Sequence, residues 1–497
     1  MYYDICIIGA GIVGSLIARQ LSKYKVKIAV IERHVDVSMD ATGANSGIVH
    51  AGYDAKPGTK KAKFNVSGCN MMPGLCADLS VKFKKTGSFV LAFDQEGEEV
   101  LQKLYDSGIK NGVTDMAIVD KDFILKREPY VNPLVTKALY AKNAGIVSPY
   151  KLNIAAMDNA VMNGVKFLRE TKVTGIEKED GLFHISTEIT GDICSISKLD
   201  RIKEEDRTDI TAKIVINCAG AHADEISRMA GDDSFNIIPR RGEYILFDKT
   251  EGSRINTVLF QTPTEKGKGI LVTPTVDGNL MIGPDATVAD HKDDKCTNSE
   301  NLDYVFKTAS QTYTRLNIRK SITVFAGIRA TPDTSDFIIE ESKKCGNFIN
   351  VAGIESPGLT AAPAIAVYVE DMVKSLMEMK EKAKDQYTMK VKHDKPFSEM
   401  TNEEKEAACK SDELCRKIIC RCETVSEREI VSAIYAPCGA RTVDGVKRRT
   451  RAGMGRCQGG FCAPHVMRIL SEHTGIAVNK IAKADADSCI LGRHSRD

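Results

Sequence analysis

The chain has 497 residues, a length that corresponds to about three folding units and excludes a peptide hormone or a disulfide-stapled miniprotein. Lysine and arginine number 69 and aspartate and glutamate 67, so the net charge of +2 gives no global field that would attract nucleic acid or anionic lipid. With 42% hydrophobic and 27% charged residues, the composition is that of a folded globular protein and not of a disordered chain.

The N-terminal sequence and the cysteines indicate the compartment. The sequence MYYDICIIGAG contains no basic leader, and no apolar run reaches about 18 residues, so we expect a cytosolic protein without a transmembrane segment. The 15 cysteines are then expected to be reduced thiols rather than disulfides. Four of them are grouped near the C-terminal end, as a metal site requires: Cys420, Cys422, Cys457 and Cys462.

The first predicted element is a short β-branched strand over residues 4–8, which runs into Gly9, Gly11 and Gly14. A helical pattern and a second strand follow, and Glu32 ends that strand. The glycines permit a tight turn and a close approach of the backbone to a pyrophosphate, and a carboxylate at Glu32 can accept hydrogen bonds from ribose hydroxyls. This order predicts a dinucleotide site, and a glycine-rich turn in an unrelated α/β sheet is the alternative.

Two later segments, residues 212–220 and 347–360, also pass from an apolar strand through glycine into a helical stretch. Together with the N-terminal position of the single dinucleotide unit, they favour a long, buried FAD over NAD. Between them lie stretches that alternate like a β-sheet, with Asp180-Gly181 as a hairpin turn. We therefore predict an α/β fold with a Rossmann-type FAD-binding domain, an interleaved antiparallel β-sheet substrate domain and a small, mostly α C-terminal domain.

Several longer motifs resemble those of FAD-dependent oxidoreductases of the D-amino-acid oxidase superfamily. They are ATGANSGIVHAGYDAKPGTKKAKFNV (41–66), AGIVSPYKL (144–152), RRGEYILFD (240–248), GIRATPDTSDFIIE (327–340) and AGIESPGLTAAPAIA (352–366). The similarity covers about residues 3–375 and is greatest to the short glycerol-3-phosphate oxidase and dehydrogenase branch and to the L-2-hydroxyglutarate oxidase branch. It implies that FAD is the cofactor and that the substrate is a small anionic alcohol.

The resemblance also implies which residues hold the cofactor. The segment after Asp40 would line the flavin, Val173 would meet the adenine through its backbone, and the start of the last helix would offer amides to the flavin N1 and O2. The full cofactor-binding set is Gly9, Gly11, Gly14, Glu32, Arg33, Thr42, Asn45, Ser46, Gly47, Val173, Ala219, Gly220, Gly358, Leu359 and Thr360.

Oxidation of a secondary alcohol needs a base for the hydroxyl proton and an acceptor for the hydride, and His50 and Arg329 are the candidate catalytic residues. His50 is the candidate base, because imidazole titrates near neutrality and the resemblance places it beside the flavin, whereas a structural histidine is the alternative. Arg329 is the first candidate for the cation that an anionic substrate requires, and a surface arginine is the alternative. Ser46, Lys266 and Ser356 complete the candidate substrate-binding set, although Lys266 also fits a solvated loop and Ser356 a helix cap.

The C-terminal cysteines follow the pattern Cys420-x-Cys422, 34 residues, Cys457-x4-Cys462. Two short pairs of this kind can enclose one tetrathiolate centre, and the segment 418–472 resembles the bacterioferritin-associated-ferredoxin-like 2Fe-2S domain. Structural zinc is the main alternative metal. A basic group is expected to offset the negative charge of the cluster, or to form a solvated face or a docking patch for an acidic partner: Lys447, Arg448, Arg449, Arg451 and Arg456.

These inferences divide the chain into residues 1–376 (oxidoreductase), 377–417 (a charged, solvated linker) and 418–497 (2Fe-2S domain). Within the first part, we expect FAD-binding stretches at about 1–85, 145–225 and 325–376, and substrate-domain stretches at about 86–144 and 226–324.

The sequence predicts an FAD-dependent dehydrogenase that converts sn-glycerol 3-phosphate to dihydroxyacetone phosphate, with electrons leaving through the 2Fe-2S cluster to a redox partner protein or subunit. L-2-hydroxyglutarate or another 2-hydroxy acid is the alternative substrate. A non-catalytic electron-transfer subunit is the alternative of a different class.

Overall fold

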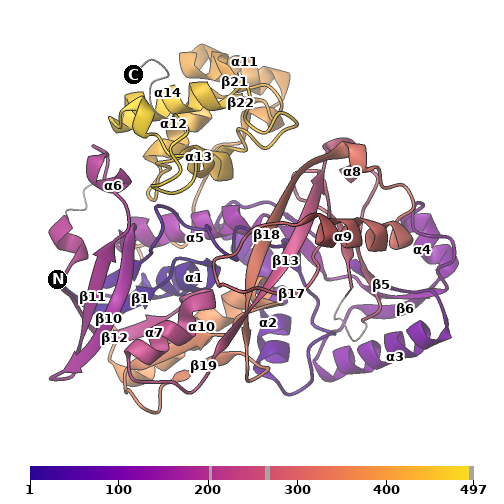
Figure 1. Ribbon diagram of the computed structural model, residues 1–497, viewed down its shortest axis with the longest axis horizontal. Helices are drawn as coiled ribbons and strands as arrows, with labels where there is room; N and C mark the ends of the chain where they lie inside the picture. Colours follow the sequence, from indigo (N-terminus) through magenta and orange to yellow (C-terminus); the bar gives the residue numbers. More distant parts are fainter. Residues whose placement is uncertain (201–203, 264–268, 492–497) are drawn as a thin grey trace.

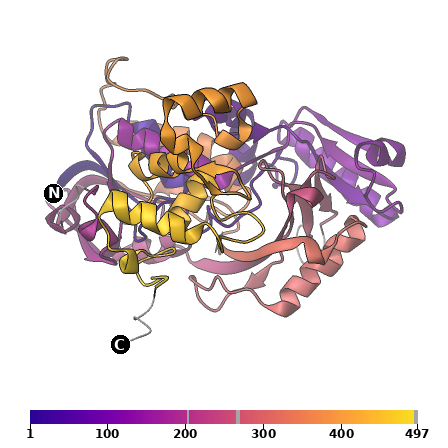
Figure 2. The ribbon, with the colours of Figure 1, turned by 90° about the horizontal axis from the view of Figure 1, so that it is seen from above.

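The computed structural model describes residues 1–200, 204–263 and 269–491, which form two sheet-containing bodies and a mostly helical C-terminal domain (Figure 1). The two large sheets lie side by side, and the C-terminal domain sits over one face of the molecule. Seen from above, it leaves the outer end of the second sheet uncovered (Figure 2). The three parts match the predicted fold class.

The first sheet has eight strands and carries the predicted nucleotide turn. Its parallel strands lie in the order β9-β2-β1-β12-β20, while β10 and β11 form an antiparallel hairpin at one edge and β19 pairs with β20. Asp180 and Gly181 turn this hairpin with φ of 49° and 80°, as predicted. The strands are β1 (Tyr2–Ile8), β2 (Ile28–Ile31), β9 (Lys166–Leu168), β10 (Thr171–Glu179), β11 (Leu182–Ile189), β12 (Ile210–Asn217), β19 (Ile338–Glu341) and β20 (Phe348–Ala352).

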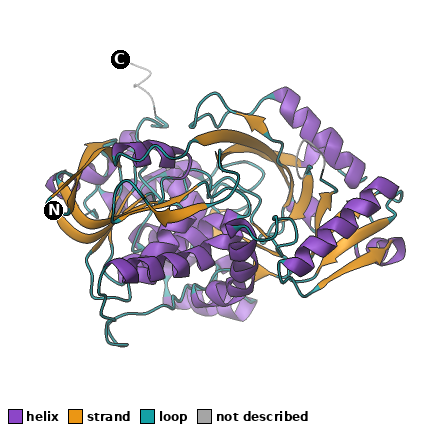
Figure 3. Ribbon diagram, turned by 90° about the horizontal axis from the view of Figure 1, so that it is seen from below, coloured by secondary structure: helices purple, strands orange, loops and turns teal. Residues whose placement is uncertain are grey.

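Helices cover this sheet and form its core with it (Figure 3). They are α1 (Ile12–Leu21), α2 (Lys60–Asp78), α5 (Pro149–Met162) and α10 (Gly358–Leu376), with α7 (Ala223–Met229) beside β10 and β20 and the short α6 (Ile193–Ile196) after β11. Gly68 allows α2 and α10 to approach closely, because a Cβ at that position would lie 1.9 Å from the carbonyl oxygen of Thr360. Within the described ranges, no helix is long and apolar enough to cross a membrane.

The second sheet has nine strands and is antiparallel apart from the parallel pair β5–β14. Its longest contact joins β13 to β18 over their whole length. The strands are β5 (Ser88–Ala92), β6 (Met116–Asp120), β7 (Lys137–Ala141), β13 (Ile237–Phe247), β14 (Val258–Gln261), β15 (Leu271–Pro274), β16 (Leu280–Gly283), β17 (Thr287–Val288) and β18 (Ser321–Pro332). The accompanying helices are α3 (Gln95–Lys110), α4 (Lys121–Arg127), α8 (Lys249–Gly252) and α9 (Ser299–Thr312), and a small sheet of β3 (Ile48–Val49), β4 (Phe83–Lys84) and β8 (Gly145–Val147) lies between the two bodies.

The segment 377–417, expected to be a charged, solvated linker, is mostly exposed but also makes contacts with the rest of the chain. Its first half follows the nucleotide-binding body, where the Arg19 guanidinium donates to the Met389 carbonyl at 2.6 Å and the Asn163 amide donates to the Thr388 carbonyl at 2.8 Å. Its second half contains α11 (Asn402–Ser411), which begins with a capping box at Thr401. Charge-rich composition alone did not reveal these contacts.

The C-terminal domain contains a short hairpin, β21 (Ile418–Cys420) and β22 (Val425–Ser426), followed by α12 (Glu427–Tyr435), α13 (Val443–Thr450) and α14 (Ala463–Thr474). Ser426 caps α12 in a capping box with Glu429, and Thr442 caps α13. Ile430, Val446 and Leu470 of these helices are fully buried in a hydrophobic core that also takes in Val35 and Ile193 of the oxidoreductase part.

Candidate active site

The glycine turn after β1 has the shape of a dinucleotide cradle. Gly9 has φ of +103°, and a Cβ there would lie 2.4 Å from the Cys218 carbonyl oxygen at the end of β12. A Cβ at Gly14 would lie 2.1 Å from the Gly9 carbonyl oxygen. Gly11 precedes α1 and gives it no side-chain cap, so the helix N-terminus faces the space where a pyrophosphate would lie. The residues present therefore fit the adenine dinucleotide part of FAD.

Glu32 stands at the end of β2, next to this turn. Its carboxylate accepts hydrogen bonds from the backbone N–H of Ala10 at 2.8 Å and of His34 at 3.0 Å, which hold it in place. Arg33 has other partners: its guanidinium pairs with Asp293 at 2.6 Å and lies 3.1 Å from Nε2 of His222. Arg33, which was predicted to bind the cofactor, therefore forms an ion pair with the loop after β17 in this structure.

The remaining predicted adenine and pyrophosphate contacts come from β10 and from the end of β12. Val173 is buried in β10 opposite Thr187. After β12, the Ala219 N–H donates to the Oδ1 atom of Asn217 at 3.3 Å, and Gly220 has φ of +57°. The end of β12 lies against the glycine turn, because a Cβ at Gly9 would lie 2.4 Å from the Cys218 carbonyl oxygen and 3.2 Å from the Ala219 Cα.

Residues 42–50 connect the glycine turn to the start of α10. Thr42 accepts a hydrogen bond at Oγ1 from the Ile12 N–H at 3.0 Å, at the beginning of α1. Gly47 has φ of +67°, and its N–H donates to the Asn45 side chain at 2.9 Å. At the other end, the His50 N–H donates to Oγ1 of Thr360 at 3.0 Å.

This path brings predicted cofactor residues from two distant parts of the sequence together. Thr42, Asn45, Ser46 and Gly47 lie on the path, and Gly358, Leu359 and Thr360 form the first turn of α10, which has no side-chain cap. A dinucleotide seated on the glycine turn has its second half beside residues 42–50. Uncapped amides at the start of α10 suit the negative charge that a reduced flavin carries.

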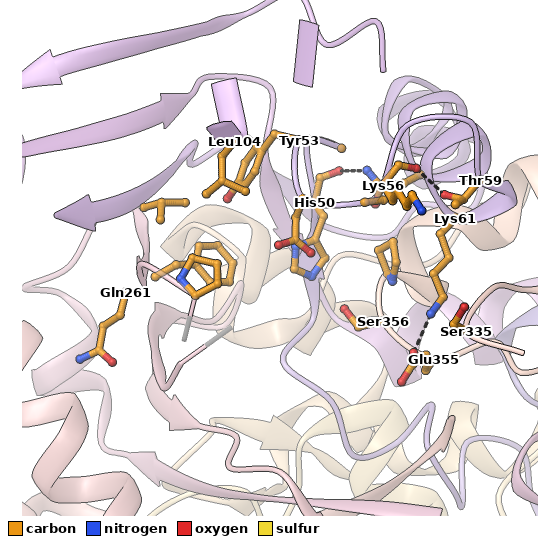
Figure 4. Close-up of a pocket in the computed structure, with 18 residues that line it drawn as sticks. His50, Tyr53, Lys56, Thr59, Lys61, Leu104, Gln261, Ser335, Glu355 and Ser356 are labelled. Atoms are coloured by element: carbon orange, nitrogen blue, oxygen red, sulfur yellow. Dashed lines mark hydrogen bonds and ion pairs between the residues drawn. The ribbon is translucent and has the colours of Figure 1, made fainter. Parts of the chain in front are cut away.

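His50 and Ser356 line the same cavity of about 380 Å³ (Figure 4). The His50 ring is half-buried, and its centroid lies 5.8 Å from that of Phe260 in β14. Two lysines also line this cavity, Lys56 and Lys61, and the Lys61 ammonium pairs with the Glu355 carboxylate at 2.7 Å. Figure 4 shows the Lys61 side chain reaching across to Glu355, next to Ser356.

The other two predicted substrate cations are placed differently. Arg329 lies on β18 opposite Arg240, and its guanidinium donates to the Asp285 carbonyl at 2.9 Å beside Tyr244, so it does not line this cavity as the described residues define it. Lys266 falls in 264–268, outside the described residues. Lys56, Lys61 and Glu355 were not predicted, although the lysines belong to the KPGTKK stretch that follows His50.

The four grouped cysteines come together as two pairs. The Sγ atoms of Cys422 and Cys457 are 4.0 Å apart. The Cys462 thiol donates to Cys420, which lowers the pKa of Cys420 to about 6 and raises that of Cys462. Among the described residues, no group of three or more His, Cys, Asp or Glu is arranged around a single metal ion.

The surroundings of the cysteines also fit an iron–sulfur centre. The backbone N–H of Gly453 points to the Cys420 sulfur, and a Cβ at Gly455 would lie 2.2 Å from Cβ of Cys422. Two thiol pairs with close backbone amides are what a two-iron cluster requires, since each iron takes two thiolates.

The basic residues of the C-terminal domain correct one expectation. Instead of forming a solvated face or a patch for an outside partner, the four arginines of this group bind acids of the oxidoreductase body. Arg449 and Arg448 pair with the buried Asp36 at 2.7 and 2.8 Å, and Arg451 pairs with Asp277 at 2.7 Å. Arg456 likewise pairs with Asp248 at 2.7 Å. These contacts dock the iron–sulfur domain on the rest of the same chain.

Comparison with known proteins agrees with both halves of the architecture. The FAD dependent oxidoreductase family model matches residues 4–372, and the BFD-like 2Fe-2S binding domain model matches residues 418–472. The chain is 47% identical to a glycerol 3-phosphate dehydrogenase of Caloramator mitchellensis over 98% of each chain. It is 31% identical to the mitochondrial L-2-hydroxyglutarate dehydrogenase of Homo sapiens, over 58% of this chain and 61% of that protein.

A solved structure supports the fold assignment. Dithionite-reduced L-α-glycerophosphate oxidase from Mycoplasma pneumoniae with FAD bound superposes with a TM-score of 0.72 at 28% identity, over 80% of this chain and 100% of that one. The glycine cradle, the paired cysteines and these matches agree on one classification. The chain belongs to the FAD-dependent oxidoreductase family and carries, at its C-terminal end, a BFD-like 2Fe-2S binding domain.

Proposed function

We propose that this chain is an FAD-dependent dehydrogenase that oxidises sn-glycerol 3-phosphate to dihydroxyacetone phosphate and sends the electrons through its 2Fe-2S centre. The observation that carries the proposal is that one chain contains both a dinucleotide cradle and two cysteine pairs, in domains that are packed against each other. The relative from Caloramator mitchellensis, whose name is glycerol 3-phosphate dehydrogenase, shares this whole length.

Bound FAD would supply the hydride acceptor, and the cluster would carry single electrons. His50 would take the hydroxyl proton of the substrate, since its imidazole lines the cavity and a histidine ring nitrogen can accept a proton. The Ser356 hydroxyl, on the same wall, can hydrogen-bond a substrate oxygen. Phe260 beside His50 limits the access of water to the reacting carbon.

A phosphate dianion in this cavity needs positive partners, and the described lining supplies Lys56 and Lys61. We propose that these two lysines bind the anion in this cavity, whereas the roles of Arg329, which lies outside the lining, and of Lys266 stay predictions. The Glu355 carboxylate, which holds Lys61 at 2.7 Å, keeps the ammonium at the cavity wall.

The iron–sulfur domain favours a dehydrogenase over an oxidase. A cluster that passes one electron at a time has no task if O₂ reoxidises the flavin directly. The proposed acceptor is therefore a one-electron redox protein or subunit outside this chain. Its identity and the expected cytosolic location stay predictions.

A second candidate substrate is L-2-hydroxyglutarate or another 2-hydroxy acid. The human L-2-hydroxyglutarate dehydrogenase supports it, but that relative matches only part of this chain. The proposed mechanism stays the same with this substrate, because a carboxylate would replace the phosphate at the same lysines.

Anaerobic titration of the purified holoenzyme tests the proposal. We expect sn-glycerol 3-phosphate to bleach the visible flavin band, L-2-hydroxyglutarate to leave it unchanged, and dye reduction to far exceed oxygen consumption. His50→Ala should slow the bleaching by about 10²–10⁴-fold while FAD stays bound. Bleaching by the 2-hydroxy acid alone would reassign the substrate, and no bleaching by either compound would refute the proposed function.

A further inference from the structure

Among the contacts between the iron–sulfur domain and the oxidoreductase body, one joins a tyrosine hydroxyl to a thioether sulfur. Met454, in the loop between the two cysteine pairs, places its sulfur 3.5 Å from the hydroxyl of Tyr150, at the start of α5. We propose that this Tyr150–Met454 contact is where electrons cross from the flavin side to the 2Fe-2S side. The inference rests on the proposed function and adds the route that the electrons take.

On one side, the contact continues to the segment expected to line the flavin. Tyr150 is the second residue of α5, and the residues before it touch Gly47. The Val147 N–H donates to the Gly47 carbonyl at 2.8 Å. A Cβ at Gly47 would lie 2.4 Å from the Val147 carbonyl oxygen and 3.4 Å from Cδ of Pro149. Covalent bonds and van der Waals contacts therefore join Gly47 to the Tyr150 ring without a break.

On the other side, the residues flanking Met454 touch the cluster ligands. The Gly453 N–H donates to the Cys420 sulfur, and Gly455 packs directly on Cys422. Gly453 and Gly455 thus contact one cysteine of each spatial pair, because Cys420 lies with Cys462 and Cys422 lies with Cys457. The Met454 thioether therefore belongs to a residue whose two neighbours in the chain contact both spatial pairs of cysteines.

A buried guanidinium fixes this contact. Arg451 ends α13 in the left-handed region, with φ of +73°, and its side chain is 12% exposed. It donates to Asp277 at 2.7 Å and to Glu423 at 2.7 Å, and lies 3.5 Å from the Tyr150 hydroxyl. Asp277 belongs to the turn between β15 and β16, so one arginine ties the cysteine loop, the second sheet and Tyr150 together.

Other contacts near the cysteines lead elsewhere. Glu423 follows Cys422 and pairs with Lys249 at 2.9 Å, and Arg456 precedes Cys457 and pairs with Asp248. Asp248 and Lys249 lie at the start of α8, directly after β13 of the second sheet. Electron tunnelling falls off steeply with distance and decays less through packed atoms than through gaps. The Tyr150 side therefore offers the packed path toward the flavin segment.

The electron count is balanced with an outside acceptor. Oxidation of one alcohol to a ketone releases two electrons and two protons, and the electrons cross the Tyr150–Met454 contact one at a time. An external one-electron acceptor, a redox protein or a dye, must reoxidise the cluster between the two crossings. Burial raises the pKa of Tyr150, so its hydroxyl stays protonated at neutral pH, and the released protons leave by another group.

The experiment measures electron crossing in the holoenzyme, started by a light flash that photoreduces the flavin under anaerobic conditions. The flavin band and the cluster band are followed together, and freeze-quench EPR counts reduced clusters. Met454→Ala and Tyr150→Leu open a gap, Met454→Leu refills it with a side chain of similar volume, and Lys249→Ala loosens the same interface without touching the contact.

We expect cluster reduction to slow at least about tenfold in Met454→Ala and Tyr150→Leu, which corresponds to about 1.4 kcal/mol of activation free energy. Met454→Leu and Lys249→Ala should remain close to wild type, and all variants should show the wild-type EPR signal after dithionite. Cluster reduction at the wild-type rate in both gap variants would overturn the inference. Because light starts the reaction, a substrate that fails to bleach the flavin would refute the proposed function and leave this test intact.

Discussion

Asp36 is the residue whose replacement most directly tests how the iron–sulfur domain is held. Its carboxylate is 2% exposed, accepts hydrogen bonds from both Nη atoms of Arg449 at 2.7 and 2.9 Å, and accepts a third from Arg448 at 2.8 Å. In the variant Asp36→Asn, an amide NH₂ replaces one oxygen and faces a guanidinium that also only donates. The change therefore removes the negative charge and places donor against donor.

The expected cost follows from this geometry. Burial opposes ionisation of Asp36, but Arg449 and Arg448 hold the pKa of its carboxyl well below the usual range. Removing one partner of a buried ion pair costs about 3–5 kcal/mol, because the other charge stays buried without compensation. We expect Asp36→Asn to lower the free energy of unfolding of the C-terminal domain by that amount at pH 7.

Urea unfolding provides the assay, followed by far-UV circular dichroism and by the visible band of the cluster. The matched control is Lys344→Ala, which removes an ion pair with Asp233 between two exposed side chains and should leave the free energy of unfolding close to that of the wild type. Equal losses in Asp36→Asn and Lys344→Ala would show that the buried pair does not hold the domain, and the reasoning would fail.

Three further predictions concern other parts of the chain. Burial lowers the pKa of His34, but hydrogen bonds to Asp40 and Asp485 raise it to about 10. His34→Gln should thus be least stable relative to wild type below about pH 6.5, and the difference in unfolding free energy should shrink toward pH 10; a pH-independent difference would contradict this. Gly14→Ala should yield protein without bound FAD, seen as loss of the flavin absorbance, because its Cβ would lie 2.1 Å from the Gly9 carbonyl. Cys457→Ser should lose the EPR signal of the cluster but keep flavin bleaching by substrate, whereas a retained signal would exclude Cys457 as a ligand.

The sequence predicted those features whose determinants are adjacent in the chain. The turn from Gly9 to Gly14 has its strand, glycines and helix in one stretch, and the Asp180-Gly181 hairpin needs only two residues with positive φ. In each case, local backbone geometry allows few other residue types.

Contacts between charged side chains were not predictable in the same way. The basic residues of α13 gave no sign that they bind Asp36, more than 400 positions earlier in the chain. Lys61 reaches Glu355 from 294 positions away. The sequence around a lysine or arginine does not indicate its ion-pair partner, since the charged group can equally well be solvated by water. Only the fold determines which acid lies opposite.

The loop that follows β2 serves two ligand sites at once. Glu32 lies at the nucleotide cradle, and four residues later Asp36 forms an ion pair with Arg449 of the iron–sulfur domain. Between them, the His34 ring lies 2.6 Å from the Asp485 carboxylate. A ligand that orders this loop at Glu32 also favours the conformation in which Asp36 binds the iron–sulfur domain, and the reverse holds as well. By reciprocity of binding energies, loading of the adenine cofactor and insertion of iron should reinforce each other, so that chains lacking either one mature poorly.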